Sequence, residues 1–300
     1  MTTVLVTGAA GRLGSQTVET LCEAGLDVRA TDINYSRDLP VPLELCDLLD
    51  GRAIYPLVDG CDAVVQLGNH PGPHSHVPPQ QLYRENVAMD INVFQAAVDV
   101  GARCIVFSSS VQALAGTRHR EEDIGKPSCL AYLPIDGDAP ACPGNTYALS
   151  KQAGENQLRY YARLHPELCC TAIRFPFIFH DRYRRWFRRM SGFGRRHRHF
   201  SNLDEGFSYL HVEDAASLIL TVVRKSTPGY HQLFPAAPDN PLDASIPEII
   251  EEFYPDVPLR VPADQMESLV DISKIEEDWG WRPEHTHVLD DLQEGEEDED

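Results

Sequence analysis

The chain has 300 residues, of which 42% are hydrophobic, and a formal net charge of −20. This apolar content supports a substantial core and excludes a chain that is disordered throughout, while the acidic balance excludes a general nucleic-acid binder, which needs a basic face to neutralise phosphates. No stretch approaches the ~18 apolar residues of a membrane span and no signal peptide opens the chain, so we expect a cytoplasmic protein without membrane segments.

The first half of the chain alternates short β-branched runs with longer amphipathic stretches, which is typical of a parallel sheet covered by helices on both faces. Strands are predicted at residues 4–7, 27–31, 43–45, 63–67, 104–108 and 171–175. After Phe175, proline and glycine become frequent, and the recognisable helices fall at 211–223, 245–253 and 272–278.

These patterns predict an α/β fold, a Rossmann-type doubly wound parallel sheet with a smaller C-terminal substrate domain. We expect the NAD-binding unit at residues 1–174 and the substrate-binding region at 175–290, with parts of the latter returning to the sheet. Six of the last seven residues are acidic, so residues 291–300 are expected to form a disordered tail.

A glycine motif follows the first predicted strand and opens an amphipathic helix, the context in which such a motif binds a dinucleotide. It reads Thr-Gly-Ala-Ala-Gly-Arg-Leu-Gly from Thr7 to Gly14. Gly8 permits the tight turn, Gly11 lets the backbone approach a pyrophosphate, and Gly14 allows close helix packing, with the phosphate held at the positive helix end.

Asp32 stands at the end of the second predicted strand. A carboxylate there would accept hydrogen bonds from the adenosine ribose and repel a 2′-phosphate, which favours NAD over NADP. Arg12 or Arg37 could offset that repulsion, and Asp32 could instead serve as a turn or helix-cap residue.

A long helix is predicted between the fourth and fifth strands, where Val87, Ile91, Phe94 and Val98 recur at helical spacing and Gly101 supplies the stop. A second apolar stripe follows Val93, Ala97 and Val100. Two apolar faces favour burial against a second subunit, so we expect a homodimer, with complete burial inside one chain as the alternative.

The pair most directly tied to catalysis is Tyr147 and Lys151, which are four residues apart and therefore on one face of a predicted helix. Lowering a tyrosine pKa from about 10 towards 7 requires roughly 4 kcal/mol, which the ammonium and the positive nicotinamide of a bound cofactor could supply together. The tyrosine could then move a proton while a hydride leaves or joins the same carbon. One hydroxyl of Ser108 to Ser110, which end the fifth strand, could orient the reacting oxygen.

With these motifs in this order, the chain resembles the extended short-chain dehydrogenase/reductase group, the NAD-dependent epimerase/dehydratase family. The matching segments run through nearly the whole chain, at 7–14, 32, 46–48, 67–68, 85–87, 108–110, 147–151, 209–214 and 271–281. The resemblance implies that Ser110 is the catalytic serine, with Ser109 as the fallback, and that Lys151 also holds the nicotinamide ribose. Asp47 could equally be a cap, and Asn86 an ordinary polar helix residue.

The expected site therefore combines the residue-based and the family-based assignments. The catalytic residues are Ser110, Tyr147 and Lys151. Together with Tyr147 and Lys151, the residues expected to bind NAD are Gly8, Ala10, Gly11, Arg12, Leu13, Gly14, Asp32, Asp47, Leu48, Leu67, Gly68, Asn86 and Phe175. Those expected to contact the substrate are His70, Ser110, Gln112, Tyr147 and Arg182.

No metal is expected, because His70, His74 and His76 lie in a proline-rich loop without an evident fourth ligand. The eight cysteines show no Cys-x-x-Cys spacing, which indicates reduced residues of the core.

Three departures from the family pattern bear on the substrate. The segment 118–141 lengthens the connection between the serine strand and Tyr147, as either a lid or a surface loop. Phe177 stands where many nucleotide-sugar epimerases carry asparagine. The residues that follow Ser110 lack the Thr-Asp-Glu arrangement of sugar 4,6-dehydratases and the Asn-His of sugar-acid dehydrogenases.

Residues 182–198 contain eight arginines, whose forked guanidinium groups suit a carboxylate or phosphate. They favour an anionic sugar derivative as the substrate, with a solvated helix face as the alternative. The leading hypothesis is an NAD-dependent oxidoreductase or epimerase acting on a sugar or nucleotide-sugar hydroxyl. Its alternatives are a dehydrogenase of a free sugar or sugar acid and a non-catalytic NAD-binding scaffold.

Overall fold

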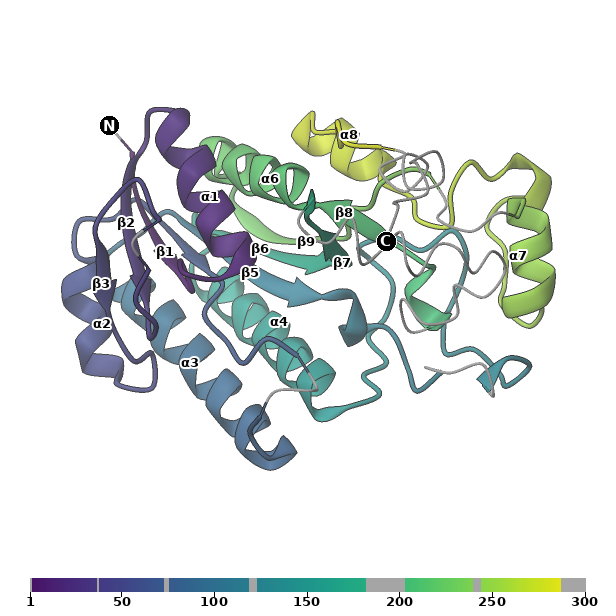
Figure 1. The fold of residues 1–300 in the computed structure, drawn as a ribbon, viewed down its shortest axis with the longest axis horizontal. Helices are drawn as coiled ribbons and strands as arrows, with labels where there is room; N and C mark the ends of the chain where they lie inside the picture. Colours follow the sequence, from purple (N-terminus) through teal and green to yellow (C-terminus); the bar gives the residue numbers. More distant parts are fainter. Residues whose placement is uncertain are drawn as a thin grey trace, which may run out of the picture.

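The computed structural model describes residues 2–36, 38–72, 76–118, 123–181, 203–239 and 244–286 (Figure 1). In this part of the chain, one parallel sheet of seven strands has the order β3-β2-β1-β4-β5-β6-β9. Its strands are β1 (Thr3–Thr7), β2 (Asp27–Asp32), β3 (Leu43–Leu45), β4 (Ala63–Gln66), β5 (Cys104–Ser110), β6 (Cys169–Phe175) and β9 (Gly229–Leu233). The strand order reverses between β1 and β4, which confirms the predicted doubly wound fold and places the switch point there.

Six of the seven helices in the described residues lie close to where the sequence predicts them, and the helix at Gly51–Val58 was not predicted. The seven helices are α1 (Arg12–Glu23), α2 (Gly51–Val58), α3 (Pro79–Asp99), α4 (Thr146–Leu164), α6 (Val212–Lys225), α7 (Ile246–Phe253) and α8 (Ser273–Trp279). Gly101 has a φ of 81° just past α3 and ends it as predicted.

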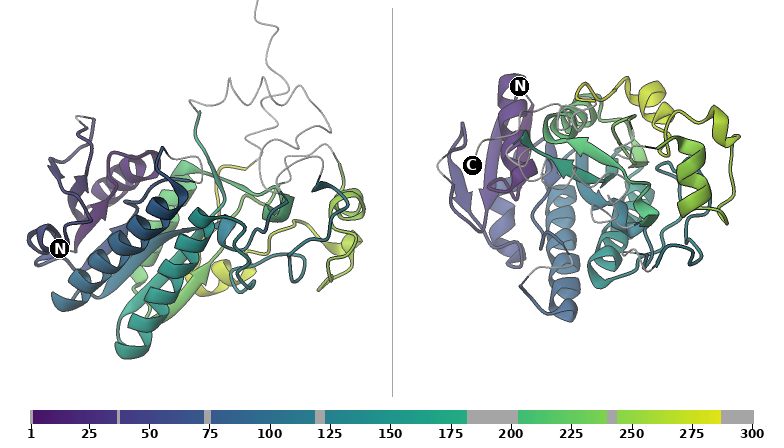
Figure 2. Two further views of the ribbon diagram at one scale, coloured as in Figure 1. Left: turned by 90° about the horizontal axis from the view of Figure 1, so that it is seen from below. Right: turned by 45° about the vertical axis from the view of Figure 1, so that its right-hand side comes forward.

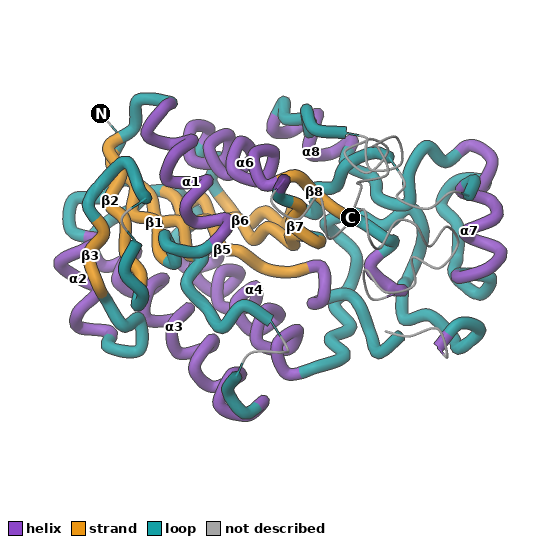
Figure 3. The backbone as a smooth tube through the Cα atoms, in the orientation of Figure 1, coloured by secondary structure: helices purple, strands orange, loops and turns teal. Residues whose placement is uncertain are grey.

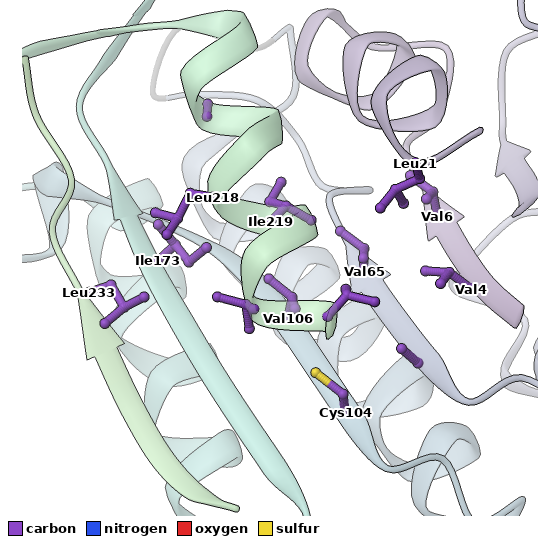
Figure 4. Packing of buried hydrophobic residues seen from close by; sticks show 14 of the residues in the cluster. Val4, Val6, Leu21, Val65, Cys104, Val106, Ile173, Leu218, Ile219 and Leu233 are labelled. Atoms are coloured by element: carbon purple, nitrogen blue, oxygen red, sulfur yellow. The ribbon is translucent and has the colours of Figure 1, made fainter. Parts of the chain in front are cut away.

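Each face of the sheet has its own core, because side chains alternate along the strands. Val4, Val65 and Val106 face α1 and α6. Leu218 and Ile219 of α6 pack onto the strands (Figure 4). The neighbouring residues on the strands point to the other face, where α2, α3 and α4 cover them. Figure 2 shows α3 and α4 side by side on that face.

The second apolar stripe of α3 is buried by the chain itself. Val93 and Ala97 are fully buried within the single chain, and Val100 is half-buried. These residues therefore give no support to a subunit interface, and the intrachain alternative accounts for them.

The prediction of six strands missed β9. Its sequence, Gly-Tyr-His-Gln-Leu, has no apolar run, and most of its residues are only half-buried because it lies at the edge of the sheet, beside β6. A polar edge strand of this kind leaves too weak a periodicity for sequence reasoning to detect.

The long segment between β5 and α4 has exposed residues, among them 125–127, but parts of it are anchored in a core. Leu133 and Ile135 are fully buried and bridge to Leu259 and Val270. They belong to a third core, which packs beneath α7 in a region where loops predominate (Figure 3). None of the described residues from 118 to 141 lines the cavity presented below.

A short second sheet pairs β7 (Phe177–Phe179) with β8 (Tyr209–His211). Three 3₁₀ turns complete the described elements: η1 (Val111–Ala113), η5 (Leu203–Glu205) and η6 (Ala263–Gln265). All eight cysteines are free, and five of them are buried, as predicted. In the described residues, no helix combines the length and the apolar character that crossing a membrane requires.

Candidate functional site

The carboxyl edge of the sheet opens into a cavity of about 1110 Å³. Its wall includes the turn after β1, the ends of β2, β4 and β5, and the first residues of α4. The sequence-predicted residues in this wall are Gly8, Ala10, Gly11, Arg12, Leu13, Gly14, Asp32, Asp47, Leu48, Leu67, Gly68, His70, Ser110, Gln112, Tyr147, Lys151 and Phe175. The cavity thus joins the predicted cofactor residues to the predicted catalytic residues.

In the glycine turn, Gly8 and Gly14 have no room for a Cβ atom. Gly8 has a φ of 63°, and a Cβ on it would lie 2.8 Å from the backbone nitrogen of Gly68. A Cβ on Gly14 would lie 2.0 Å from the carbonyl oxygen of Gly8. Helix α1 begins at Arg12, its N-cap residue Gly11 provides no side-chain cap, and its first turn lines the cavity. The backbone N–H groups of such a helix end suit a pyrophosphate, so these residues fit a dinucleotide.

Two aspartates line the cavity near this turn. The Asp32 carboxylate accepts hydrogen bonds from the backbone nitrogens of Ala10 at 3.0 Å and Asn34 at 2.8 Å. Asp47 accepts one from the backbone nitrogen of Leu49 at 2.9 Å. Both carboxylates therefore cap local turns, as the alternative interpretation proposed, and both also face the cavity.

Ser110 and Tyr147 meet at the end of β5 and the start of α4. Burial raises the pKa of Tyr147 to about 12, a hydrogen bond with Ser110 acts in the opposite direction, and the charges of Glu205 and Asp90 add to the rise. The pKa of Tyr147 is thus raised by burial in the protein alone, whereas the lowering towards 7 predicted from the sequence also requires a bound, positively charged nicotinamide.

Lys151 lines the cavity and is only 3% exposed. Its Nζ donates to Oδ1 of Asn69 at 2.6 Å and to the carbonyl of Ser108 at 2.8 Å, and it lies 5.6 Å from the ring centroid of Tyr147. Burial lowers the pKa of Lys151 to about 8, and the charge of Asp90 opposes that shift. The predicted tyrosine and lysine are therefore neighbours, but the lysine's direct partners come from other elements.

Two polar residues close to Lys151 were missed by the sequence analysis. Asn69 follows β4 and lines the cavity, while Asp90 is fully buried on α3. Asp90 stands four residues after Asn86 on the same helix, and an aspartate on a buried helix face is the signal that could have revealed it.

Asn86 does not line the cavity but holds a residue that does. Its Oδ1 accepts from the backbone nitrogen of His70 at 2.9 Å, and its Nδ2 donates to the hydroxyl of Ser150 at 3.1 Å. The ring of His70 is 2.7 Å from a carboxylate oxygen of Glu85, which also lines the cavity. Asn86 thus fixes the backbone of His70 rather than pointing into the site.

Ser109 and Ser110, at the end of β5, have different partners. The hydroxyl of Ser109 donates to Oε1 of Glu155 at 2.7 Å, and Glu155 forms a buried ion pair with Arg174. Ser110 points the other way along the strand, towards Tyr147. This geometry supports Ser110 over Ser109 as the serine next to the reacting group.

Glu205 of η5 and Asn145 also lie in the cavity wall and were not predicted. Asn145 caps α4 by accepting from the backbone nitrogen of Ala148 at 2.8 Å, and its Nδ2 donates to Gln112 at 3.2 Å. Arg182 and His74 lie outside the described residues, as do Arg37, the rest of the arginine-rich segment and residues 291–300.

Comparison with known proteins gives one family match. The family model described as the NAD dependent epimerase/dehydratase family matches residues 4–233. An NAD-dependent glucose-6-phosphate dehydrogenase of Haloferax volcanii is 33% identical over 171 residues, which are 54% of this chain and 63% of that protein. A uronate dehydrogenase of Agrobacterium fabrum is 35% identical over 163 residues, 54% of this chain and 56% of that protein. The matched part of the chain thus spans somewhat more than half the length of these relatives.

Solved structures share the fold. A UDP-glucose 4-epimerase from Brucella ovis in complex with NAD has a TM-score of 0.68 and 19% identity, with 96% of this chain and 95% of that chain covered. At this identity the likeness concerns the fold alone.

Proposed function

Since the chain belongs to the NAD-dependent epimerase/dehydratase family, we propose that it oxidises a hydroxyl-bearing carbon of a sugar or sugar derivative. NAD is the cofactor, and when bound it supplies the acceptor for the hydride. The observation that carries the proposal is that Ser110, Tyr147 and Lys151 line the same cavity as the glycine turn and Asp32.

In this proposal the chain's own groups handle the proton. Tyr147 first gives up its own phenolic proton, and the nearby Lys151 ammonium stabilises the resulting phenolate, since a nearby positive charge favours the ionised tyrosine. The phenolate then takes the proton of the substrate hydroxyl, and Ser110, which also favours the ionised tyrosine, orients the reacting oxygen. Asp32 and Asp47 place negative charge at the opposite end of the predicted cofactor site, which disfavours a 2′-phosphate and therefore NADP.

For the substrate we propose a free sugar or an anionic sugar derivative. Phe177 lines the cavity and cannot replace the hydrogen bonds of the asparagine that many nucleotide-sugar epimerases carry there. The relatives named as glucose-6-phosphate and uronate dehydrogenases act on anionic sugars. Arg182 is the proposed partner of that anionic group, and Arg182→Ala should raise KM for sugar acids and sugar phosphates but leave KM for neutral sugars unchanged.

The test of the proposal is a panel of sugars, sugar acids, sugar phosphates and nucleotide sugars, assayed with NAD and NADP by nicotinamide absorbance. Tyr147→Phe should lose turnover with every active substrate while Kd for NAD changes little, because the ring stays and only the hydroxyl goes. Tyr160→Phe, an exposed residue on the same helix, is the matched control. Undiminished turnover in Tyr147→Phe would refute the assignment, and a panel without any turnover would favour the scaffold alternative.

Epimerisation is the second candidate, because the family and the solved fold include epimerases. An epimerase keeps its cofactor through the cycle, whereas a dehydrogenase releases it. NAD that survives purification, without net NADH formation, would favour epimerisation; rapid exchange and NADH accumulation would favour the dehydrogenase.

We also propose a cytoplasmic homodimer. The free cysteines suit a reducing compartment. Helix α4 exposes Leu149, Tyr160 and Leu164 beside α3, and exposed apolar side chains of this kind are suited to a subunit interface. Analytical ultracentrifugation of the protein and of Leu164→Asp tests this: a stable dimer that Leu164→Asp weakens is expected, and a monomer at micromolar concentration would refute it.

A further inference from the structure

A fully buried carboxylate lies on the far side of Asn69 from Lys151. Oδ1 of Asp90 accepts hydrogen bonds from Nε2 of Gln66 at 2.9 Å and from Nδ2 of Asn69 at 3.1 Å. Its other oxygen, Oδ2, has no hydrogen-bond partner among the described residues. Burying a carboxylate with half of its acceptors unused opposes folding, so packing alone does not explain an aspartate at this position.

The Asn69 side chain connects the two charges. Its Nδ2 donates to Asp90, which turns Oδ1 towards the ammonium of Lys151 at 2.6 Å. In a flipped amide, the NH₂ group would face the Lys151 ammonium and the oxygen would face the Asp90 carboxylate. Both contacts would be repulsive, so they fix the orientation of the amide. The amide dipole is thereby aligned between the carboxylate and the ammonium.

The same contacts set the direction of Lys151. Asn69 and the carbonyl of Ser108 take two of its three N–H groups. They hold Nζ 4.9 Å from the ring centroid of Phe107 and 5.6 Å from that of Tyr147. We propose that Asp90 is a positioning residue for the reaction: acting through Asn69, it aims Lys151 and keeps the lysine protonated inside the buried site. The inference rests on the proposed function.

The charges around the pair agree with this role. Burial lowers the pKa of Lys151 to about 8, and Asp90 is the charged group that opposes the shift. Burial likewise raises the pKa of Asp90 to about 6, and the positive charge of Lys151 acts to lower it. The other titratable groups facing this site are Tyr147 on α4 and Glu205 on η5, whose charge acts on Tyr147. The charge of each group thus favours the ionised form of the other.

The experiment is an NMR titration of Lys151 in the full chain, without substrate. The sequence contains four lysines, Lys126, Lys151, Lys225 and Lys274, so protein labelled with ¹³C at lysine Cε gives few resonances, and Lys151→Arg assigns the one of interest. In Asp90→Asn the pKa of Lys151 should fall by at least about one unit, the effect of removing a close opposite charge. Asp99→Asn, on an exposed residue of the same helix, should leave it unchanged.

A second variant and a kinetic profile complete the test. Asn69→Ala keeps both charges but removes the connecting amide, and it should also lower the pKa of Lys151. With an active substrate, the loss of kcat at high pH should move to lower pH in Asp90→Asn by the shift that NMR measures. A one-unit fall from about 8 lowers the protonated fraction of Lys151 at pH 8 from about one half to about one tenth, so kcat at pH 8 should fall about fivefold. A Lys151 pKa that is the same in the wild type, Asp90→Asn and Asn69→Ala would overturn the inference. Because the titration needs no turnover, this result differs from a failure of the proposed function.

Discussion

Removing Arg174 should destabilise the protein strongly, because it would leave a carboxylate unpaired in the core. Nε and Nη2 of Arg174 donate to the two oxygens of Glu155 at 2.8 and 2.9 Å, and the two side chains are 1% and 0% exposed. Nη1 donates to the carbonyl of Ala139 at 2.6 Å and so attaches the segment before α4 to the sheet. Breaking a buried ion pair from one side costs about 3–5 kcal/mol.

The measurements are urea unfolding, which gives the free energy of unfolding, and thermal unfolding, which gives Tm, of Arg174→Met, both followed by circular dichroism. In a chain of this size 1 kcal/mol corresponds to about 2 °C in Tm, so the expected loss is roughly 6–10 °C. Arg103→Met is the matched control: Arg103 contacts Asp62 at 3.0 Å, but the two side chains are 67% and 34% exposed. Such a solvent-screened pair contributes about 0–1 kcal/mol.

A double variant separates the buried charge from the lost packing. Adding Glu155→Gln to Arg174→Met removes the unpaired charge and keeps an acceptor for Ser109. This variant should regain at least half of the stability that Arg174→Met loses. The reasoning is refuted if Arg174→Met costs no more than Arg103→Met, or if the double variant is as unstable as the single one.

Three further predictions concern the cofactor turn and the pH dependence of stability. Gly8→Ala should weaken NAD binding at least tenfold by calorimetry, because its Cβ would lie 2.8 Å from the backbone nitrogen of Gly68; unchanged affinity would contradict the proposed turn. Asp32→Ser should reduce the ratio of Kd for NADP to Kd for NAD, since it removes the charge that repels a 2′-phosphate. Burial acts to lower the pKa of His285, but its hydrogen bond with Asp214 raises it overall. The stability from this pair is thus full below about pH 6.5 and lost as pH rises through the raised pKa, so Asp214→Asn should cost more unfolding free energy at pH 5.5 than at pH 8.5.

The sequence alone determined the features whose causes are local. A glycine-rich turn between a strand and a helix indicates a dinucleotide site from the local sequence alone. The sequence therefore identified Gly8, Gly11 and Gly14, which line the cavity. Helical spacing likewise put Tyr147 and Lys151 on one face of α4, and apolar runs predicted six strands of the sheet.

Only the tertiary structure decided features that depend on residues far apart in the chain. Ser109 and Ser110 are equivalent by composition, and what separates them is that one contacts Glu155 and the other Tyr147. Strand β9 is recognisable only because β6 offers it an edge to pair with.

The assignment most changed by the structure is that of Lys151. By sequence it is a cation one helical turn from Tyr147, whereas in the fold its ammonium is held by Asn69 after β4 and the carbonyl of Ser108 on β5, with Asp90 of α3 behind Asn69. Helical periodicity reports neighbours within one element. The partners that set a buried group's charge and direction come from several elements, and only the packing of the sheet and its helices brings them together.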